Sequence, residues 1–195
     1  MIDFKPSINF WHDFKSNQIA GIWLFLGSRR SLQMVRPSIL QLVFWGILGG
    51  CANSLFSWLS SGRIGEFNSQ GLVSYALWPF IALIVGIFLS QRINNPRLML
   101  VPALLWLVLD THIMLFQCLI QYLGDLDYLP YILYDYIPTL FVMLFVWQSL
   151  AVVWVISREL KWPWWERALI MLATLFTLVV WQISVKDQPI WKVEE

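Results

Sequence analysis

Long blocks of apolar side chains alternate with short polar segments along this sequence. A helix needs about 20 mostly apolar residues to cross the hydrocarbon core of a bilayer. Five blocks approach or exceed that length, and they occupy residues 39–59, 71–90, 98–122, 131–156 and 168–185. Because the linkers between them are short, we expect a single all-α, up-and-down bundle of five transmembrane helices over residues 37–186.

The segment before the first block, residues 1–36, follows a different pattern. Aromatic and aliphatic residues are interleaved with polar ones between residues 10 and 26. This pattern is typical of an amphipathic helix that lies in the membrane interface, with Arg29 and Arg30 reaching lipid phosphates. The alternative is a membrane-adjacent loop that packs on the bundle. Residues 187–195 would form a short tail after the last span.

Lys and Arg are unevenly divided between the two sides of this bundle. The segment before the first block, the second linker and the fourth linker would share one side and carry ten of them, whereas the other side carries three. Such residues are concentrated on the cytoplasmic side of membrane proteins. We therefore predict an inner-membrane protein with a cytoplasmic N-terminus and an exported, periplasmic C-terminus.

The composition agrees with a membrane location and excludes several classes of protein. Hydrophobic residues make up 58% of the chain and charged residues only 13%, whereas a soluble domain has about 25% charged residues. The net charge of +1 provides no basic surface for nucleic acid. The lipid bilayer is the expected partner, and a soluble enzyme, a nucleic-acid-binding module and a disordered chain are excluded.

Small residues recur at helical spacing in the first two blocks. Membrane helices associate where small side chains let their backbones approach. In the first block these residues are Gly46, Gly50 and Ser54, and in the second they are Ala82, Gly86 and Ser90. We expect both stripes to face other helices, and each could face the other. Asn53 lies beside the first stripe and could form a hydrogen bond across it.

Three ionisable residues fall inside the blocks, and burying charge in a membrane is so costly that each is a candidate functional residue. Asp110 lies roughly 18 Å into the third block, close to the middle of the bilayer. It shares a helical face with Gln117 and Gln121, which predicts a polar stripe leading to the exported surface. His112 points to another side of the helix, and Asp135 lies near the exported end of the fourth block.

Two interpretations of Asp110 remain open at this point. Its carboxyl group could be protonated or hydrogen-bonded and hold helices together, or it could bind a proton or a substrate. No catalytic motif and no cluster of metal-ligand residues is present in the sequence, so we predict no catalytic residues, no metal and no cofactor. Cys51 and Cys118 are best explained as small packing residues.

Two resemblances to known families add expectations. A cytoplasmic N-terminal segment followed by five spans resembles the layout of the Yip1-like membrane proteins. Residues 65–72, which enter an apolar block with Pro79, and residues 188–191 after the last span are similar to the membrane region that precedes the peptidase domain in some bacterial legumain-like (C13 family) proteins. The second resemblance covers about residues 20–195. It implies a membrane anchor or partner for an exported-side hydrolase, without catalysis in this chain.

These observations favour a non-catalytic accessory, anchoring or assembly subunit of a bacterial-type inner-membrane complex. Its protein partner would lie within the membrane or on the exported side. The first alternative is a small transporter or channel component that uses Asp110 as an intramembrane polar or proton site. The second alternative is a membrane-embedded enzyme with Asp110 or His112 in its site.

Overall fold

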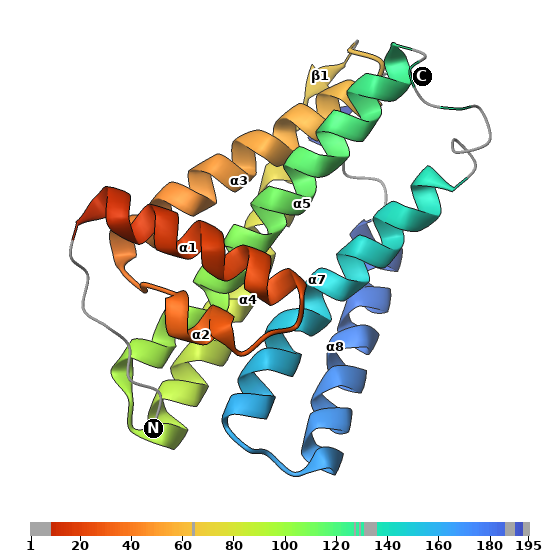
Figure 1. The fold of residues 1–195 in the computed structure, drawn as a ribbon. Helices are drawn as coiled ribbons and strands as arrows, with labels where there is room; N and C mark the ends of the chain where they lie inside the picture. Colours follow the sequence, from red (N-terminus) through yellow and green to blue (C-terminus); the bar gives the residue numbers. More distant parts are fainter. Residues whose placement is uncertain are drawn as a thin grey trace.

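Helices make up almost all of the structure, a computed structural model that describes residues 9–63, 65–126, 128, 130, 136–185 and 190–192. The long helices are α3 (Ile39–Ser60), α4 (Ser69–Ile93), α5 (Val101–Asp125), α7 (Ile137–Glu159) and α8 (Trp164–Val185) (Figure 1). The shorter elements are α1 (Phe10–Phe25), α2 (Arg30–Met34), the 3-10 helix η1 (Pro96–Met99) and two two-residue strands, β1 (Glu66–Phe67) and β2 (Trp191–Lys192).

Four segments of the described chain are long and apolar enough to cross a membrane. They are α3, α4, η1 together with α5, and α7. These helices overlap the first four predicted blocks, although α7 begins at Ile137 rather than at residue 131, and residues 131–135 lie outside the described ranges. The fifth predicted block lies within α8, which is a helix of 22 residues but is not among those four.

Polar residues fix the ends of these helices. The Ser38 side chain accepts a hydrogen bond from the Gln41 backbone N–H at the start of α3, and Asn68 caps α4 in the same way. Such caps satisfy N–H groups that have no partner within the helix. Asn94 follows α4 as its C-cap, and its φ of 53° is left-handed, a conformation that asparagine tolerates better than most residues.

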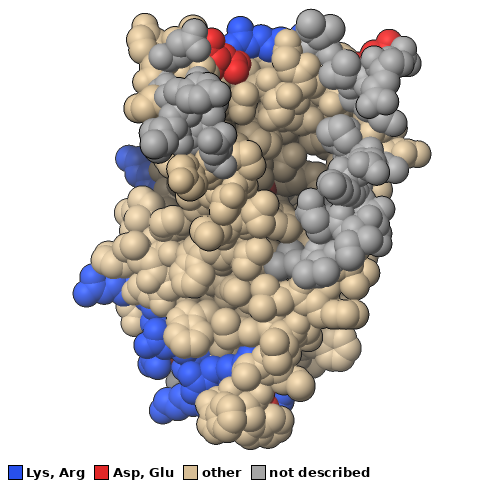
Figure 2. All heavy atoms as spheres, turned by 90° about the vertical axis from the view of Figure 1, so that its right-hand side faces the viewer, with Lys and Arg blue, Asp and Glu red and all other residues tan. Residues whose placement is uncertain are grey.

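The links between the helices alternate between two ends of the bundle. At one end the Arg92 guanidinium lies 5.6 Å from the centre of the Trp162 ring, which joins the α4–η1 turn to the α7–α8 turn. At the other end Arg63 donates to Asp125 over 3.1 Å, and β1 pairs antiparallel with β2. Figure 2 shows Lys and Arg side chains clustered around the lower end of the molecule, where the first of these contacts lies. We call it the basic end.

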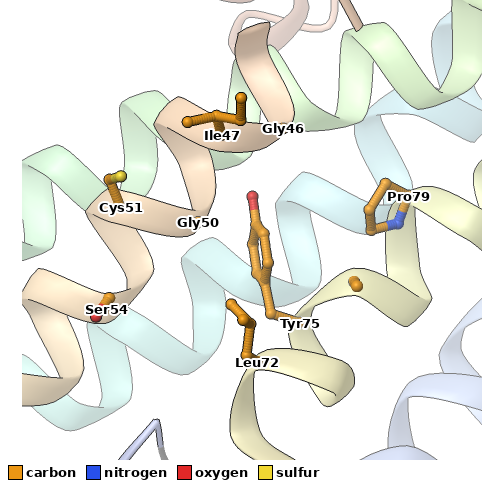
Figure 3. Close-up of a pocket in the computed structure, with 9 residues that line it drawn as sticks. Gly46, Ile47, Gly50, Cys51, Ser54, Leu72, Tyr75 and Pro79 are labelled. Atoms are coloured by element: carbon orange, nitrogen blue, oxygen red, sulfur yellow. The ribbon is translucent and has the colours of Figure 1, made fainter. Parts of the chain in front are cut away.

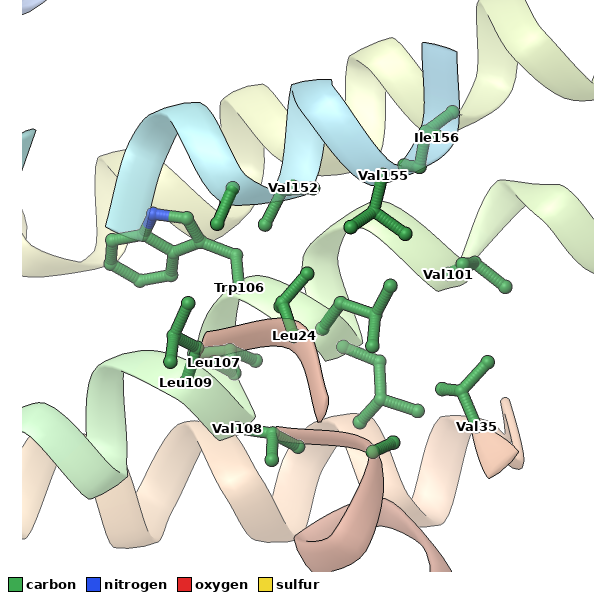
Figure 4. Close-up of a cluster of buried hydrophobic side chains, with 14 of the residues drawn as sticks. Leu24, Val35, Val101, Trp106, Leu107, Val108, Leu109, Val152, Val155 and Ile156 are labelled. Carbon is green, nitrogen blue, oxygen red and sulfur yellow. The ribbon is translucent and has the colours of Figure 1, made fainter. Parts of the chain in front are cut away.

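Helix α5 is the centre of the bundle. The most apolar stretch of the Pro96–Asp125 segment is 78% buried inside the protein. The corresponding stretches of the other three candidate spans are only 12–39% buried. Figure 4 shows its Leu107 and Val108 packed with Leu24 of α1 and Val155 of α7. Helices α1, α3, α4 and α7 therefore surround α5, whereas α8 packs against α7, and the outer faces of these helices are the ones that contact lipid in a membrane.

Helix α1 crosses the bundle in front of α5 (Figure 1), and its polar face is turned inward. Asp13, Ser16 and Asn17 are buried, whereas Trp11 is 67% exposed and Ile22 is 55% exposed. The N-terminal segment is thus helical and packs on the bundle. An interfacial amphipathic helix is not confirmed, because the polar face that such a helix turns to water lies against protein here.

Hydrogen bonds tie α1 to the rest of the chain. The Asn17 side chain accepts from the Arg36 backbone N–H at 2.7 Å and donates to Gln41 at 3.1 Å. The Trp147 indole of α7 donates to the Phe25 carbonyl at 2.8 Å. The two Asn17 bonds satisfy polar groups that would otherwise be buried without partners. Together with the exposed Trp147 bond, they hold α1 against both α3 and α7.

Candidate functional site

The centre of the site is a hydrogen bond between α5 and α7. Asp110 is 2% exposed and Gln148 is completely buried. The Gln148 side-chain N–H donates to Asp110 Oδ1 at 2.7 Å. Both partners are buried, and a buried polar group that loses its partner costs about 1–3 kcal/mol, so this contact fixes the rotation of α7 against α5.

Helix α4 brings a third polar group to the same place. The Tyr75 hydroxyl lies close enough to interact with the Asp110 carboxyl, without forming a hydrogen bond of normal geometry. Gly49 of α3 leaves room for this hydroxyl: a Cβ atom there would overlap the Tyr75 oxygen and lie 2.9 Å from Thr111 Oγ1. Four helices therefore meet around Asp110.

Five buried polar atoms in this region lack a hydrogen-bond partner of normal geometry among the described residues. They are Tyr75 Oη, Trp106 Nε1, Asp110 Oδ2, Gln117 Oε1 and Gln148 Oε1. We call these five residues the polar seam. Buried polar groups are nearly always paired with protein or with ordered water, so this concentration of unpaired atoms distinguishes the seam from ordinary helix packing.

The polar face of α5 continues from the seam toward the end of the bundle opposite the basic end. Gln121 is half-buried, and its side-chain N–H donates to Asp125 Oδ1 at 3.2 Å. Asp125 in turn accepts from Arg63, and both are partly exposed. In the other direction, residues 101–105 of α5 are all apolar and buried. The structure thus places Asp110, Gln117 and Gln121 on one face of α5, with polar positions that extend from Asp110 toward the end that carries Asp125.

His112 lies on another side of α5. Its Nδ1 is 2.6 Å from the Val108 carbonyl oxygen, and its ring stacks on Trp45 with centroids 5.8 Å apart. The Gly21 backbone of α1 covers the ring. His112 therefore packs beneath α1 and does not join the seam. Asp135 lies outside the described residues.

The first small-residue stripe lines a groove. Between α3 and α4 is a hollow of about 460 Å³, which opens to the side of the bundle (Figure 3). Its lining is almost wholly apolar, and it consists of Gly46, Ile47, Gly50, Cys51 and Ser54 of α3 with Leu72, Tyr75, Ala76 and Pro79 of α4. We call it the α3–α4 groove. The Tyr75 ring projects from α4 toward α3, so Tyr75 lines the groove and also belongs to the seam.

The second stripe faces elsewhere, so the suggestion that the two stripes face each other is wrong. Gly86 lies directly against the Met99 carbonyl of η1, and a Cβ atom would not fit there. The Ser90 hydroxyl donates to Ile87 of its own helix, and Ala82 is half-buried. Asn53 makes no side-chain hydrogen bond within the described part of the chain. Gly86 nevertheless allows the close backbone approach that is expected at a small residue, here between α4 and η1.

Three seam residues escaped the sequence analysis: Tyr75, Trp106 and Gln148. Gln148 carried a usable signal, because it is a lone amide deep in an otherwise apolar block. Tyr75 and Trp106 carried none, since aromatic residues are frequent throughout this chain.

The described residues offer no group of three His, Cys, Asp or Glu side chains that could hold a metal ion. In comparisons with known proteins, no family, no curated protein and no solved structure matches this chain.

Proposed function

We propose that the protein is a non-catalytic accessory, anchoring or assembly subunit of a bacterial-type inner-membrane complex. The observation that carries the proposal is the α3–α4 groove, which opens sideways from the bundle between two candidate spans and is lined by small residues. Its occupant is a transmembrane helix of the partner subunit, which places bulky apolar side chains into the groove.

The shape of the groove supports a helix as the occupant. Gly46 and Gly50 supply depth, whereas Ile47 is 64% exposed and forms the rim on α3. Association of helices in lipid depends on close packing, since lipid tails are as apolar as the side chains that they would replace. A rigid helix loses less entropy on entering such a groove than a flexible lipid chain does.

The proposal includes a topology with α8 as the fifth span. Helix α8 starts at the basic end, where Trp164 and Trp165 are exposed, as in the aromatic belt of a membrane interface. Arg92 of α4, Arg158 of α7 and Arg167 of α8 lie near the helix ends on this same side, which we assign to the cytoplasm by the positive-inside rule. Helix α1 then lies within the cytoplasmic leaflet, and the C-terminus is periplasmic.

Site-directed photocrosslinking in the native membrane tests the groove. A crosslinker at Ile47 or Leu72, on opposite rims, should give an adduct with another protein chain. The same crosslinker at Phe176, which is exposed on α8, is the matched control and should give none. The Gly50→Leu substitution should abolish the Leu72 adduct by filling the groove. Lipid adducts alone from both rims would refute the proposal.

One observation favours a second candidate function, a small transporter or channel component. The unpaired atoms around Asp110 are unusual for a carboxyl group that only holds helices together. No described contact favours a membrane enzyme, because His112 is turned away from Asp110. If the resemblance to C13-associated membrane regions is valid, the partner of the accessory subunit would be an exported-side hydrolase.

A further inference from the structure

We infer that the polar seam binds water and forms a one-sided proton path, through which Asp110 exchanges its proton with the end of the bundle opposite the basic end. This inference goes beyond the accessory role and does not depend on what occupies the α3–α4 groove. Three features carry it: the surroundings of Asp110, the mixture of unpaired donors and acceptors, and the asymmetry of α5.

The surroundings of Asp110 favour a protonated carboxyl group. Gln148 of α7 donates one hydrogen bond, and Tyr75 of α4 is the titratable group nearby, with Cys51 of α3 beyond Tyr75. Within the described ranges no Lys, Arg or His forms an ion pair with Asp110. A lone carboxylate buried among apolar helices is very costly, so the neutral acid is the stable form.

The unpaired atoms of the seam match water better than an ion. Trp106 Nε1 is a donor only and the two glutamine oxygens are acceptors, whereas Oδ2 of the neutral Asp110 carries the acid proton and can donate, because Oδ1 accepts from Gln148. A metal cation would not satisfy the indole N–H, and an anion would be repelled by the acceptors. Water both donates and accepts, and buried waters make two to four hydrogen bonds to such groups. A chain of waters is also the medium that carries protons.

The seam continues in one direction only. Gln117 lies two helical turns from Asp110, roughly 10 Å along α5, and Gln121 follows with its bond to the partly exposed Asp125. On the opposite side of Trp106, Leu104 and Leu105 are completely buried and offer no polar group. Protons therefore reach Asp110 from the end of the bundle that carries Asp125. The path stops at Asp110 and does not continue to the basic end.

Infrared spectroscopy of the purified protein in phosphatidylcholine vesicles tests the inference. The difference between the wild type and Asp110→Asn should show one protonated carboxyl band, and this band should shift after transfer to deuterated water without unfolding. The Gln117→Leu substitution should slow the shift at least tenfold. Leu104→Met, on the apolar half of the same helix, is the matched control and should leave the rate unchanged.

Two results would overturn the inference. One is the absence of a protonated carboxyl band, which would mean that Asp110 is ionised. The other is an exchange rate that is the same in Gln117→Leu as in the wild type. If Gln117→Leu does not fold, Gln121→Leu takes its place at the half-buried mouth of the path, with the same expected slowing. Neither result affects the photocrosslinking test of the groove, so the two proposals fail independently.

Discussion

Replacing Gln148 with leucine removes the amide that donates to Asp110. The Tyr75 hydroxyl also lies beside this carboxyl group, but Gln148 provides the one hydrogen bond of normal geometry that it receives from the described side chains. Leucine is similar in size to glutamine, so the substitution leaves little cavity at a completely buried position. The cost of the change therefore comes from the carboxyl oxygen that loses its partner.

The magnitude follows from two known ranges. A buried acceptor left without a donor costs about 1–3 kcal/mol, whereas hydrogen bonds between membrane helices average about 0.6 kcal/mol and reach about 1.7 kcal/mol. We expect Gln148→Leu to lower the free energy of unfolding by about 1–2 kcal/mol in the wild-type background, a range that spans the two estimates. In an Asp110→Leu background the same substitution should be nearly neutral, because the donor and the acceptor are then both absent.

A double-mutant cycle in mixed micelles measures this coupling. Unfolding by a denaturing detergent is followed by circular dichroism and tryptophan fluorescence for the wild type, both single variants and the double variant. Thr177→Val on α8 is the control: its hydroxyl bonds only to the Ala173 carbonyl of its own helix, and its loss should change stability by less than about 0.5 kcal/mol. If Gln148→Leu costs the same in both backgrounds, the two residues are not coupled and our view of the seam is wrong.

Three further predictions use the same unfolding assay or limited proteolysis. Gly49→Ala should destabilise the protein by about 1–3 kcal/mol, because the new Cβ overlaps the Tyr75 hydroxyl. Gly50→Ala should be tolerated, because its Cβ would lie 3.6 Å from the Tyr75 ring. Equal costs for the two substitutions would contradict the packing described at α3. Trp147→Phe should make the link after α1 easier to cleave by proteases, since α1 loses the indole bond; unchanged cleavage would mean that α1 is held elsewhere. Arg63→Gln should change stability by less than about 1 kcal/mol, because its bond to Asp125 is solvent-exposed, and a larger loss would show that this pair is structurally important.

The spans could be predicted because a bilayer requires long apolar blocks, and polar residues such as Ser38 and Asn94 mark where the helices begin and end. The partners of buried polar residues could not be predicted in the same way. Gln148 lies 38 residues from Asp110 in sequence, and α7 is apolar around most of its circumference, so its pattern does not fix the face that α7 turns toward α5.

The N-terminal helix shows a second limit of the sequence pattern. Apolar residues usually mark the inner face of a helix in water, but in lipid the surroundings are apolar and a polar face can be the buried one. Asn17 is completely buried, and Ile19 is exposed. The different surroundings of Gly49 and Gly50 could not be predicted either. Small residues at helical spacing indicate a stripe, but they do not show which glycine lies against another part of the chain.

The mass of the complex purified in mild detergent tests the central claim, that this protein is a subunit, most directly. Native mass spectrometry should show a second protein at fixed stoichiometry with the wild type. Ile47→Trp, which blocks the rim of the α3–α4 groove, should release that protein, whereas Phe176→Trp on the exposed face of α8 should retain it. A chain that is found alone or only with copies of itself, or a complex that is indifferent to Ile47→Trp, would contradict the account.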